Sequence, residues 1–346
     1  MARNSFLNSF LNSFLNSFLA RMRTGGLAAI VLMLLFTTLW TGSTASAATD
    51  YRGVNWADAR DNYVSGWVIP SGLTASESYA SAAAIADKVI GGFQTNLGAN
   101  TVRMPINEPS VLESWWGAYT GAIDKALARN MKVILCYWPW HNGKPDDMNR
   151  FYSMWQTVIA KYGTNANVYF EIMNEPYGYS QTDWLNVAAA WLGKFPNVPR
   201  GRVLVSGTGY SDTVVAAGND SRFKDCLLSQ HIYWYWHTDK VTEQAWKDEL
   251  VRRVGSHHGR TIVTEYGADM TTGINYNGPI GGNPRIAFMY GVPNKMRELG
   301  MGSVYWPGLR DGDTYSIQTR SGTGSNITLS TTNTSGRVQV RWAWGL

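Results

Sequence analysis

Cysteine is scarce in this sequence, with only Cys136 and Cys226 among 346 residues. A small fold held together by several disulfides is therefore excluded. Both cysteines lie in apolar segments with the pattern of strands, so we predict buried free thiols; a bridge between them is the alternative. The common metal-binding spacings C-x-x-C and H-E-x-x-H are also absent, and we predict no metal site.

Runs of basic residues are missing from most of the chain. The formal net charge is +5, but residues 1–47 contain Arg3, Arg21 and Arg23 and no acidic residue. The remaining sequence has 27 basic and 25 acidic residues. Proteins that bind a phosphate backbone carry basic patches. We therefore predict that nucleic acid is not a partner.

No apolar run reaches the length of a bilayer span. The apolar stretch Leu27–Trp40 has about 14 residues, whereas a spanning helix needs ~20. It follows Arg23 and precedes the small-residue pattern Ala45-Ser46-Ala47, an order typical of a secretory signal peptide. We predict a low-complexity leader of NSFL repeats at residues 1–21, with Met22 as the preferred start, and a signal peptide at residues 22–47. Cleavage near Ala47–Ala48 would give a secreted protein with no membrane attachment; an uncleaved membrane anchor is the alternative.

Aromatic residues, by contrast, are abundant: the chain has 16 Trp and 18 Tyr. A bulky core is one interpretation of this excess. The other is a set of stacking surfaces for the flat apolar faces of sugar rings or bases.

Short apolar strands alternate with longer helical segments after residue 50. The predicted strands are Tyr51–Asn55, Asn100–Met104, Lys132–Tyr137, Val168–Met173, Val203–Gly207, Leu227–Ile232, Thr261–Glu265 and Gly302–Trp306. The predicted helices are Tyr79–Leu97, Thr120–Arg129, Met148–Tyr162, Thr182–Lys194, Asp212–Ala217, Val241–His257 and Arg285–Leu299. This order predicts an α/β fold, a single (β/α)8 TIM barrel over residues 48–346. Residues 307–336 form a Gly/Ser/Thr-rich loop, with room for a small hairpin, before a last helix near Arg337–Trp344.

The active site of such a barrel is built at the carboxyl ends of its strands. Polar and aromatic residues occur at or just beyond these ends, and we select them as candidates for catalysis and substrate binding: Arg103, Trp138, Trp140, His141, Asn174, Glu175, His231, Tyr233, Glu265 and Trp306.

Two glutamates that face each other across a barrel mouth suit the hydrolysis of an acetal. One carboxylic acid protonates the leaving oxygen, and the other carboxylate attacks the anomeric carbon. Arg103 and Tyr233 are suitable to keep the attacking carboxylate ionised. Asn174 could bond the sugar 2-hydroxyl, and Trp306 could stack under the ring at the cleavage point.

These strand-end motifs resemble the cellulase-type family 5 glycoside hydrolases. The resemblance rests on MNEP and TEYG, together with RGVN, VRMPIN, HIY and VYW, and it covers about residues 51–310. It implies Glu175 as acid/base and Glu265 as nucleophile, with retention of configuration and no cofactor. It also implies a supporting role for Arg103, Asn174, His231, Tyr233 and Trp306, and for His141. The segments CYWPWHNG and PGLRDGDTYS depart from the family pattern, which leaves the substrate open.

Other polar and aromatic residues near the strand ends have simpler explanations. We predict that Glu171 is an interior glutamate paired with a base. Glu108 is a loop cap or a sugar contact, and Asp311 and Asp313 are turn formers or sugar ligands. Four tryptophans form either subsite walls or packing: Trp115, Trp116, Trp234 and Trp236.

Taken together, these features predict a secreted, monomeric, retaining glycoside hydrolase. Its expected substrate is a polysaccharide or oligosaccharide with β-glycosidic bonds, a glucan or mannan first and a galactan as a further candidate. The alternative is a non-catalytic carbohydrate-binding barrel, which predicts the loss of at least one of the two carboxylates.

Overall fold

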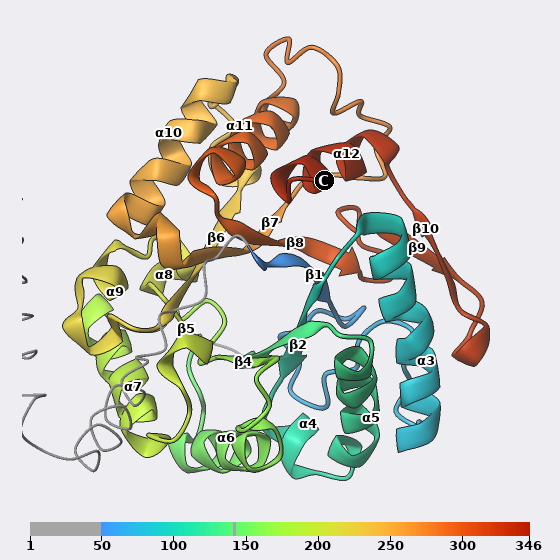
Figure 1. The fold of residues 1–346 in the computed structure, drawn as a ribbon, viewed down its shortest axis with the longest axis vertical. Coiled ribbons are helices and arrows are strands. Elements are labelled where there is room, and N and C mark those ends of the chain that lie inside the picture. The colour runs from blue at the N-terminus through green and yellow to red at the C-terminus, as the bar shows by residue number, and fades with distance from the viewer. Residues whose placement is uncertain (1–49, 141–142) are drawn as a thin grey trace, which may run out of the picture. The chain divides into compact units, whose positions relative to one another are not determined.

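Eight parallel strands form a closed barrel in the computed structural model of the protein, which describes residues 50–140 and 143–346 (Figure 1). Each strand pairs with its neighbours in chain order, and β8 closes the barrel against β1. The predicted (β/α)8 barrel is therefore confirmed. The leader, the signal peptide and His141 lie outside the described residues. The strands are β1 (Arg52–Trp56), β2 (Thr101–Ile106), β3 (Lys132–Tyr137), β4 (Val168–Glu171), β5 (Val203–Ser206), β6 (Leu227–Tyr233), β7 (Thr261–Gly267) and β8 (Gly302–Leu309).

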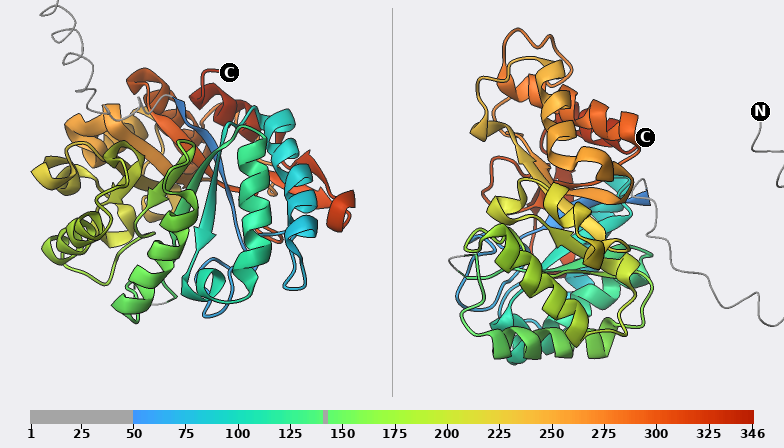
Figure 2. Two further views of the ribbon diagram at one scale, coloured as in Figure 1. Left: turned by 60° about the horizontal axis from the view of Figure 1, so that its bottom comes forward. Right: turned by 90° about the vertical axis from the view of Figure 1, so that its left-hand side faces the viewer.

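Helices surround the barrel and cover the outer faces of its strands (Figure 2). Their apolar sides pack on the strands, as expected for parallel strands that are buried on both faces. The main helices are α3 (Tyr79–Gly92), α4 (Glu108–Leu112), α5 (Trp115–Ala128), α6 (Met148–Tyr162), α7 (Gln181–Lys194), α10 (Glu243–Val254) and α11 (Pro284–Leu299).

The connection between β5 and β6 differs from the prediction. A single helix was expected at residues 212–217, but the chain forms two short helices, α8 (Thr208–Ser211) and α9 (Val215–Asn219). The backbone breaks because Gly209 and Tyr210 both have left-handed conformations, with φ of 68° and 63°. This break turns the ring of Tyr210 outward, where it is half exposed.

The segment after β8 contains the small hairpin for which the sequence leaves room. Strands β9 (Gln318–Ser321) and β10 (Thr328–Thr331) pair in antiparallel register. The chain then ends with α12 (Thr334–Ala343), which packs beside α11 (Figure 1).

Apolar side chains fill the lower part of the barrel interior. These residues come from the strands or directly precede one, and all are buried: Tyr51, Ile134, Tyr169, Leu204, Leu227, Ile262 and Val304. A packed interior of this kind leaves the carboxyl ends of the strands as the place for a site.

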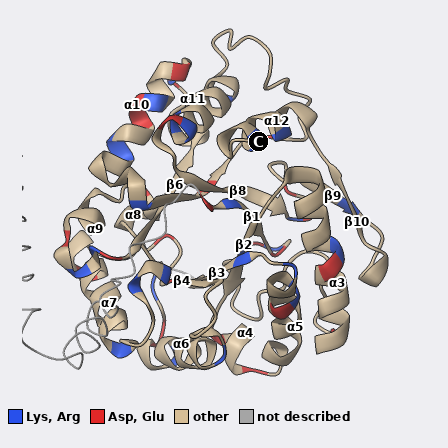
Figure 3. Cartoon of the chain, viewed as in Figure 1, with Lys and Arg blue, Asp and Glu red and all other residues tan. Residues whose placement is uncertain are grey.

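Both cysteines are buried free thiols, as predicted. Among the described residues, no helix is long and apolar enough to cross a bilayer. Acidic and basic residues occur together on α10 (Figure 3), where Glu249 pairs with Arg252 and Arg253.

Candidate active site

Glu175 lies just beyond the end of β4, on a turn that leaves the barrel. Its backbone is left-handed, with a φ of 45°. That conformation costs a non-glycine residue about 1–3 kcal/mol, and such strain is found mainly at functional sites. The proline at position 176 ends the segment. Strand β4 thus ends at Glu171, two residues earlier than the predicted Met173, and the turn that follows presents Asn174 and Glu175 at the mouth of the barrel.

Glu265 lies within β7, where the register with both neighbouring strands shifts. Gln230 pairs with Val263, but the next residue, His231, pairs with Glu265, so Thr264 is the extra residue on β7. A bulge of this kind changes the direction of the following side chain. As a result, Glu265 and His231 are direct neighbours on adjacent strands.

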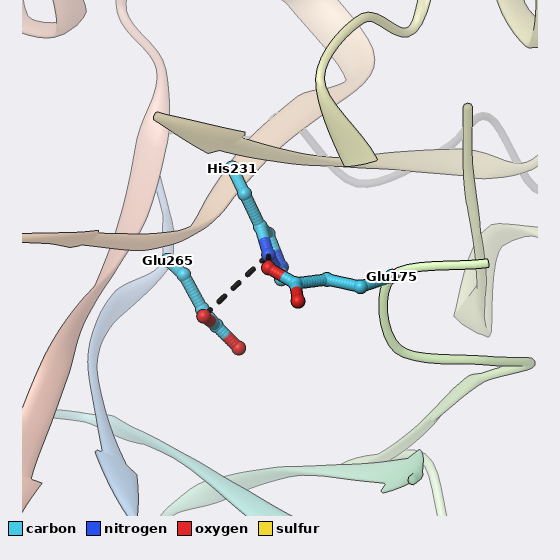
Figure 4. Close-up of side chains that lie close together, drawn as sticks. All are labelled: Glu175, His231 and Glu265. Atoms are coloured by element: carbon cyan, nitrogen blue, oxygen red, sulfur yellow. Dashed lines mark hydrogen bonds and ion pairs between the residues drawn. The ribbon is translucent and has the colours of Figure 1, made fainter. Parts of the chain in front are cut away.

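The two glutamates approach each other closely at the barrel mouth (Figure 4). One carboxylate oxygen of Glu175, one of Glu265 and one ring nitrogen of His231 all lie within 4.8 Å of one another. Carboxyl groups about 5–5.5 Å apart are typical of retaining glycosidases, whereas inverting enzymes need about 6.5–9.5 Å to admit a water molecule. The spacing therefore matches a retaining pair.

Arg103 and Tyr233 bind the two oxygens of Glu265. The Nη1 atom of Arg103 donates to Oε1 at 2.5 Å, and the Tyr233 hydroxyl donates to Oε2 at 2.8 Å. The Nδ1 atom of His231 lies 3.5 Å from Oε2. Every contact favours the ionised form of this carboxylate.

Arg103 is held in turn by a buried polar network inside the barrel. Its Nε and Nη2 atoms donate to Glu171 at 2.6 and 3.0 Å. Nη2 also donates to Oδ1 of Asn174 at 2.6 Å and to Sγ of Cys136 at 3.0 Å, and Nη1 donates to Oδ1 of Asn55 at 2.9 Å. Glu171 is thus the interior glutamate paired with a base that the sequence indicated.

Glu175 has different partners from Glu265. The Tyr63 hydroxyl donates to its Oε2 at 2.7 Å, and Nδ1 of His231 lies 2.8 Å from its Oε1. The same Tyr63 oxygen accepts a hydrogen bond from Nδ2 of Asn174 at 2.9 Å. Burial raises the pKa of Tyr63 well above its usual value, and the charge of Glu175 raises it further, so the phenol remains a neutral donor.

Burial raises the pKa of Glu265 above the ordinary glutamate value, and the nearby charge of Glu175 acts in the same direction. His231, Arg103 and the hydrogen bond from Tyr233 lower it. The side chain of Glu265 is only 4% exposed, whereas that of Glu175 is 16% exposed. The two carboxyl groups therefore have different environments: a guanidinium and a phenol contact Glu265, whereas a phenol and an imidazole contact Glu175 more closely.

Two cavities meet at the glutamates. The first, of about 310 Å³, contains both carboxyl groups, and we call it the two-carboxylate cavity. It is lined by Asp61, Tyr63, Trp138, Glu175, Tyr233, Tyr235, Glu265, Trp306, Arg310, Asp313, Thr314 and Tyr315. The second, of about 520 Å³, contains Glu175 but not Glu265, and we call it the aromatic cavity. It is lined by Glu175, Gly209, Tyr210, Asp212, His231, Tyr233, Tyr235, Trp236 and Arg253.

Most of the site residues selected from the sequence come together here. Arg103, Asn174, His231 and Tyr233 contact the glutamates or one another, and Trp138 and Trp306 stack with their ring centroids 5.6 Å apart. Trp140 is half exposed and lines a different hollow, beside Glu108 and Arg150.

Two of the four tryptophans with two interpretations, Trp115 and Trp236, take opposite positions. Trp115 is buried in the core, whereas Trp236 is 65% exposed in the aromatic cavity. Sequence reasoning missed Tyr63, Arg310 and Tyr315, which lie on loops, and Tyr235, which lies in a short 3-10 helix after β6. Of these, Arg310 and Tyr315 belong to a segment already marked, PGLRDGDTYS.

Glu175, His231 and Glu265 also have the composition of a small cation site. Their carboxylate oxygens, however, already contact protein groups. Arg103 and Tyr233 bind the oxygens of Glu265, and Tyr63 and His231 bind those of Glu175. A guanidinium at 2.5 Å already balances the charge of Glu265. The arrangement fits acid–base chemistry better than metal binding.

Relatives with sequence similarity have endoglucanase names. The chain is 26% identical over 161 residues to an endoglucanase of Clostridium saccharobutylicum, an alignment that covers 44% of this chain and 34% of the relative. It is 27% identical over 164 residues to endoglucanase Z of Dickeya dadantii (strain 3937), covering 44% and 35% respectively. The alignments thus span about a third of the length of these curated relatives.

Solved structures share the fold at low sequence identity. The endocellulase of Pyrococcus horikoshii, in complex with cellotetraose, superposes with a TM-score of 0.62 at 17% identity, covering 85% of this chain and 92% of that chain. An endo-β-1,4-glucanase of Xanthomonas axonopodis pv. citri gives a TM-score of 0.57 at 16% identity, covering 86% and 99%. The family model for cellulases, glycosyl hydrolase family 5, matches residues 70–307. That match covers more than half of the chain and includes both glutamates, and the chain therefore belongs to glycosyl hydrolase family 5.

Proposed function

We propose that the protein is a secreted retaining glycoside hydrolase that cleaves β-glycosidic bonds in a polysaccharide by double displacement. The observation that carries this proposal is the pair Glu175 and Glu265. Their oxygens lie within 4.8 Å of each other and their side chains line one cavity. A retaining mechanism needs this spacing.

In the first step, a carboxylate oxygen of Glu265 attacks the anomeric carbon, and the bond from that carbon to the leaving oxygen breaks. Glu175, as a carboxylic acid, gives its proton to the leaving oxygen. The products are a free sugar or chain end and a glycosyl ester on Glu265. Arg103 and Tyr233 keep Glu265 ionised before the attack.

In the second step, water attacks the same carbon from the opposite face. Glu175, now a carboxylate, removes a proton from this water, and the ester bond to Glu265 breaks. Two inversions give net retention of configuration. Tyr63 and His231 hold Glu175 in reach of both the leaving oxygen and the incoming water.

Aromatic rings suit the binding of the sugar at the cleavage point. Trp138 and Trp306 both line the two-carboxylate cavity, and their rings are inclined by only 25°. Asn174 is held by Arg103 and Tyr63. We propose that Trp306 stacks against the sugar ring and that Asn174 bonds its 2-hydroxyl.

A β-glucan is the first substrate to test. The family match and the endoglucanase names of the relatives favour it. Mannan and galactan remain in the test because the segment PGLRDGDTYS, which departs from the family pattern, supplies part of the wall of the two-carboxylate cavity.

A non-catalytic carbohydrate-binding barrel is the second candidate. It predicts a missing carboxylate, whereas both glutamates are present and held by separate hydrogen bonds. The arrangement therefore favours the hydrolase.

A panel of soluble β-glucan, mannan and galactan tests the proposal with the wild type, Glu175→Gln and Glu265→Gln. We expect each substitution to reduce the release of reducing ends at least 1,000-fold while the melting temperature changes little. With an aryl β-glycoside, whose phenolate leaves without a proton donor, azide separates the roles in Glu175→Ala and Glu265→Ala, because it can occupy the space of the lost carboxylate. A β-glycosyl azide is expected from Glu175→Ala and an α-glycosyl azide from Glu265→Ala. Unchanged turnover in both Gln variants would end the assignment.

Secretion is tested by sequencing the N-terminus of the protein recovered from the culture medium. We expect a start near Ala48, and the intact residues 22–47 on the secreted protein would contradict the proposed cleavage.

A further inference from the structure

The two cavities can be assigned to opposite sides of the scissile bond, if the protein is the hydrolase proposed above. The sugar whose anomeric carbon is attacked must lie beside both carboxyl groups, and only the two-carboxylate cavity contains both. The leaving group needs Glu175 alone, and the aromatic cavity contains Glu175 without Glu265. The two-carboxylate cavity therefore holds the glycone, and the aromatic cavity holds the leaving group.

Charged residues from two loops form part of the wall of the glycone cavity. Nη1 of Arg310 lies 2.8 Å from Oδ2 of Asp313, and its Nη2 lies 3.6 Å from Oδ2 of Asp61. Asp61 belongs to the loop after β1, whereas Arg310 and Asp313 follow β8. These three side chains add charged hydrogen-bond donors and acceptors to a cavity whose lining is otherwise largely aromatic.

Backbone contacts fix these charged groups in place. Nε of Arg310 donates to the carbonyl oxygen of Asp58 at 3.2 Å, and Oδ1 of Asp313 accepts from the backbone of Tyr315 at 2.7 Å. Asp311, the residue after Arg310, donates its backbone N–H to Oγ of Ser71, which lies on the loop after β1. Since β1 and β8 are adjacent in the barrel, the two loops are joined beside the glycone cavity. Pre-organised groups of this kind lose little freedom when a ligand binds.

We propose that Arg310, Asp313 and Asp61 form a specificity site that recognises the hydroxyl groups of a neutral glycone sugar. A planar guanidinium presents neighbouring N–H donors, and carboxylates accept hydrogen bonds from hydroxyls. Adjacent hydroxyls of a sugar can satisfy both at once. Arg310 carries one positive charge and the two aspartates carry two negative charges, so the net charge of this site is negative. The two glutamates beside it are acidic as well, and a glycone with a carboxylate is therefore repelled.

The leaving-group side differs in the exposure of its aromatic rings, because Trp138 and Trp306 of the glycone cavity are buried. Tyr210 and Trp236 are 49% and 65% exposed, with ring centroids 6.4 Å apart and planes inclined by 27°. Tyr177 stacks on Tyr210 at 4.8 Å. Aromatic rings bind the apolar faces of many sugars, with little dependence on individual hydroxyls. Selectivity therefore belongs to the glycone cavity, and the leaving group can vary.

Aryl β-glycosides test this site. The wild type is first assayed on the aryl glucoside, mannoside and galactoside. The glycoside that it cleaves fastest is then compared with its 3-, 4- and 6-deoxy analogues and with the corresponding uronic acid. We expect kcat/KM of the wild type to fall about 10- to 100-fold for at least one deoxy analogue, and further for the uronic acid. In Arg310→Ala and Asp313→Asn the parent glycoside should lose activity, while the ratio of parent to deoxy analogue approaches one.

Arg320→Ala is the matched control, because Arg320 forms an equivalent ion pair with Asp311 in the same segment but does not line the glycone cavity. It should keep the discrimination of the wild type, and melting temperatures show whether each variant is folded. The specificity site alone would be overturned by a wild type that does not discriminate or that cleaves the polysaccharides but none of the aryl glycosides. Folded Arg310→Ala and Asp313→Asn variants that still discriminate would overturn it too. If the wild type is no more active than Glu265→Gln on both the glycosides and the polysaccharides, the proposed function is overturned together with the specificity site.

Discussion

Tyr233 contributes one hydrogen bond to Glu265, and that bond affects the pH at which the nucleophile is ionised. Burial raises the pKa of Glu265, and the Tyr233 hydroxyl lowers it by stabilising the carboxylate. Activity requires the carboxylate and is lost as the pH falls through this pKa. Tyr233→Phe should therefore move the acid limb of the kcat/KM profile to higher pH, by up to about one unit, or ~1.4 kcal/mol.

Tyr290→Phe is the control for this change, since the Tyr290 hydroxyl donates to the carbonyl oxygen of Gly278 and does not line either cavity. Its acid limb should match that of the wild type. An acid limb that stays in place or moves to lower pH in Tyr233→Phe would show that Glu265 does not govern it.

Arg103 is the residue on which the buried charges depend. Its side chain is 1% exposed and pairs with Glu171 and Glu265, which are 0% and 4% exposed. Arg103→Met leaves both carboxylates buried without their cation, and removing one partner of a buried ion pair costs about 3–5 kcal/mol. We expect a loss of this size in the free energy of unfolding, measured by urea denaturation at pH 7.

Arg222→Met serves as the comparison, because Arg222 pairs with Asp220 at the surface and is 43% exposed. Its effect should stay below about 1 kcal/mol. Equal effects of the two substitutions would contradict the importance assigned to the buried network.

At the scale of elements, α5 contains two glycines in contrasting environments. A Cβ atom on Gly121 would lie 2.2 Å from the carbonyl oxygen of Tyr79 in α3, whereas one on Gly117 has no atom within 4 Å. Gly121→Ala should destabilise the protein by about 1–3 kcal/mol, because α3 and α5 must separate. Gly117→Ala should stabilise it by about 0.5–1 kcal/mol through helix propensity. Thermal unfolding measures both, and a stabilising Gly121→Ala would contradict the packing.

The sequence predicts the regular elements well because their physical signals are local. The strands are short apolar runs, and α6 has the same bounds in the sequence prediction and in the structure. The segment at residues 208–219 could not be predicted in this way. Its break depends on left-handed backbone at Gly209 and Tyr210, and no local pattern shows where a residue such as tyrosine adopts that conformation.

The candidate site is predictable to the extent that it lies at strand ends. Glu175 and Glu265 follow from chain order and barrel geometry, since parallel strands carry their carboxyl ends to one side. Tyr63 could not be found, because it lies on an irregular loop and its contact with Glu175 joins residues 112 positions apart. Arg310 and Asp313 are similar: the sequence marks their segment as unusual, but not the cavity that it lines.

At the scale of the whole molecule, the closed barrel brings separate strands to a common mouth. Glu175 follows β4, and Glu265 lies in β7. Arg103 in β2 extends into the barrel interior and donates to Glu265. The packed lower interior supports this polar layer from beneath. Under the proposed function, the direction of the substrate follows from the two cavities, because one contains both carboxyl groups and the other contains Glu175 alone.

In the proposed mechanism Glu265 becomes covalently bound to the sugar, and trapping this intermediate is the decisive experiment. A 2-deoxy-2-fluoro-β-glycosyl fluoride slows both steps through the fluorine at C2, while the fluoride at C1 leaves readily and allows the first step to proceed. Peptide mass spectrometry should then find one fluoroglycosyl group on the peptide that contains Glu265, and none in Glu265→Gln. A label on Glu175 or Glu171, or hydrolysis with inverted configuration and no label, would contradict the account.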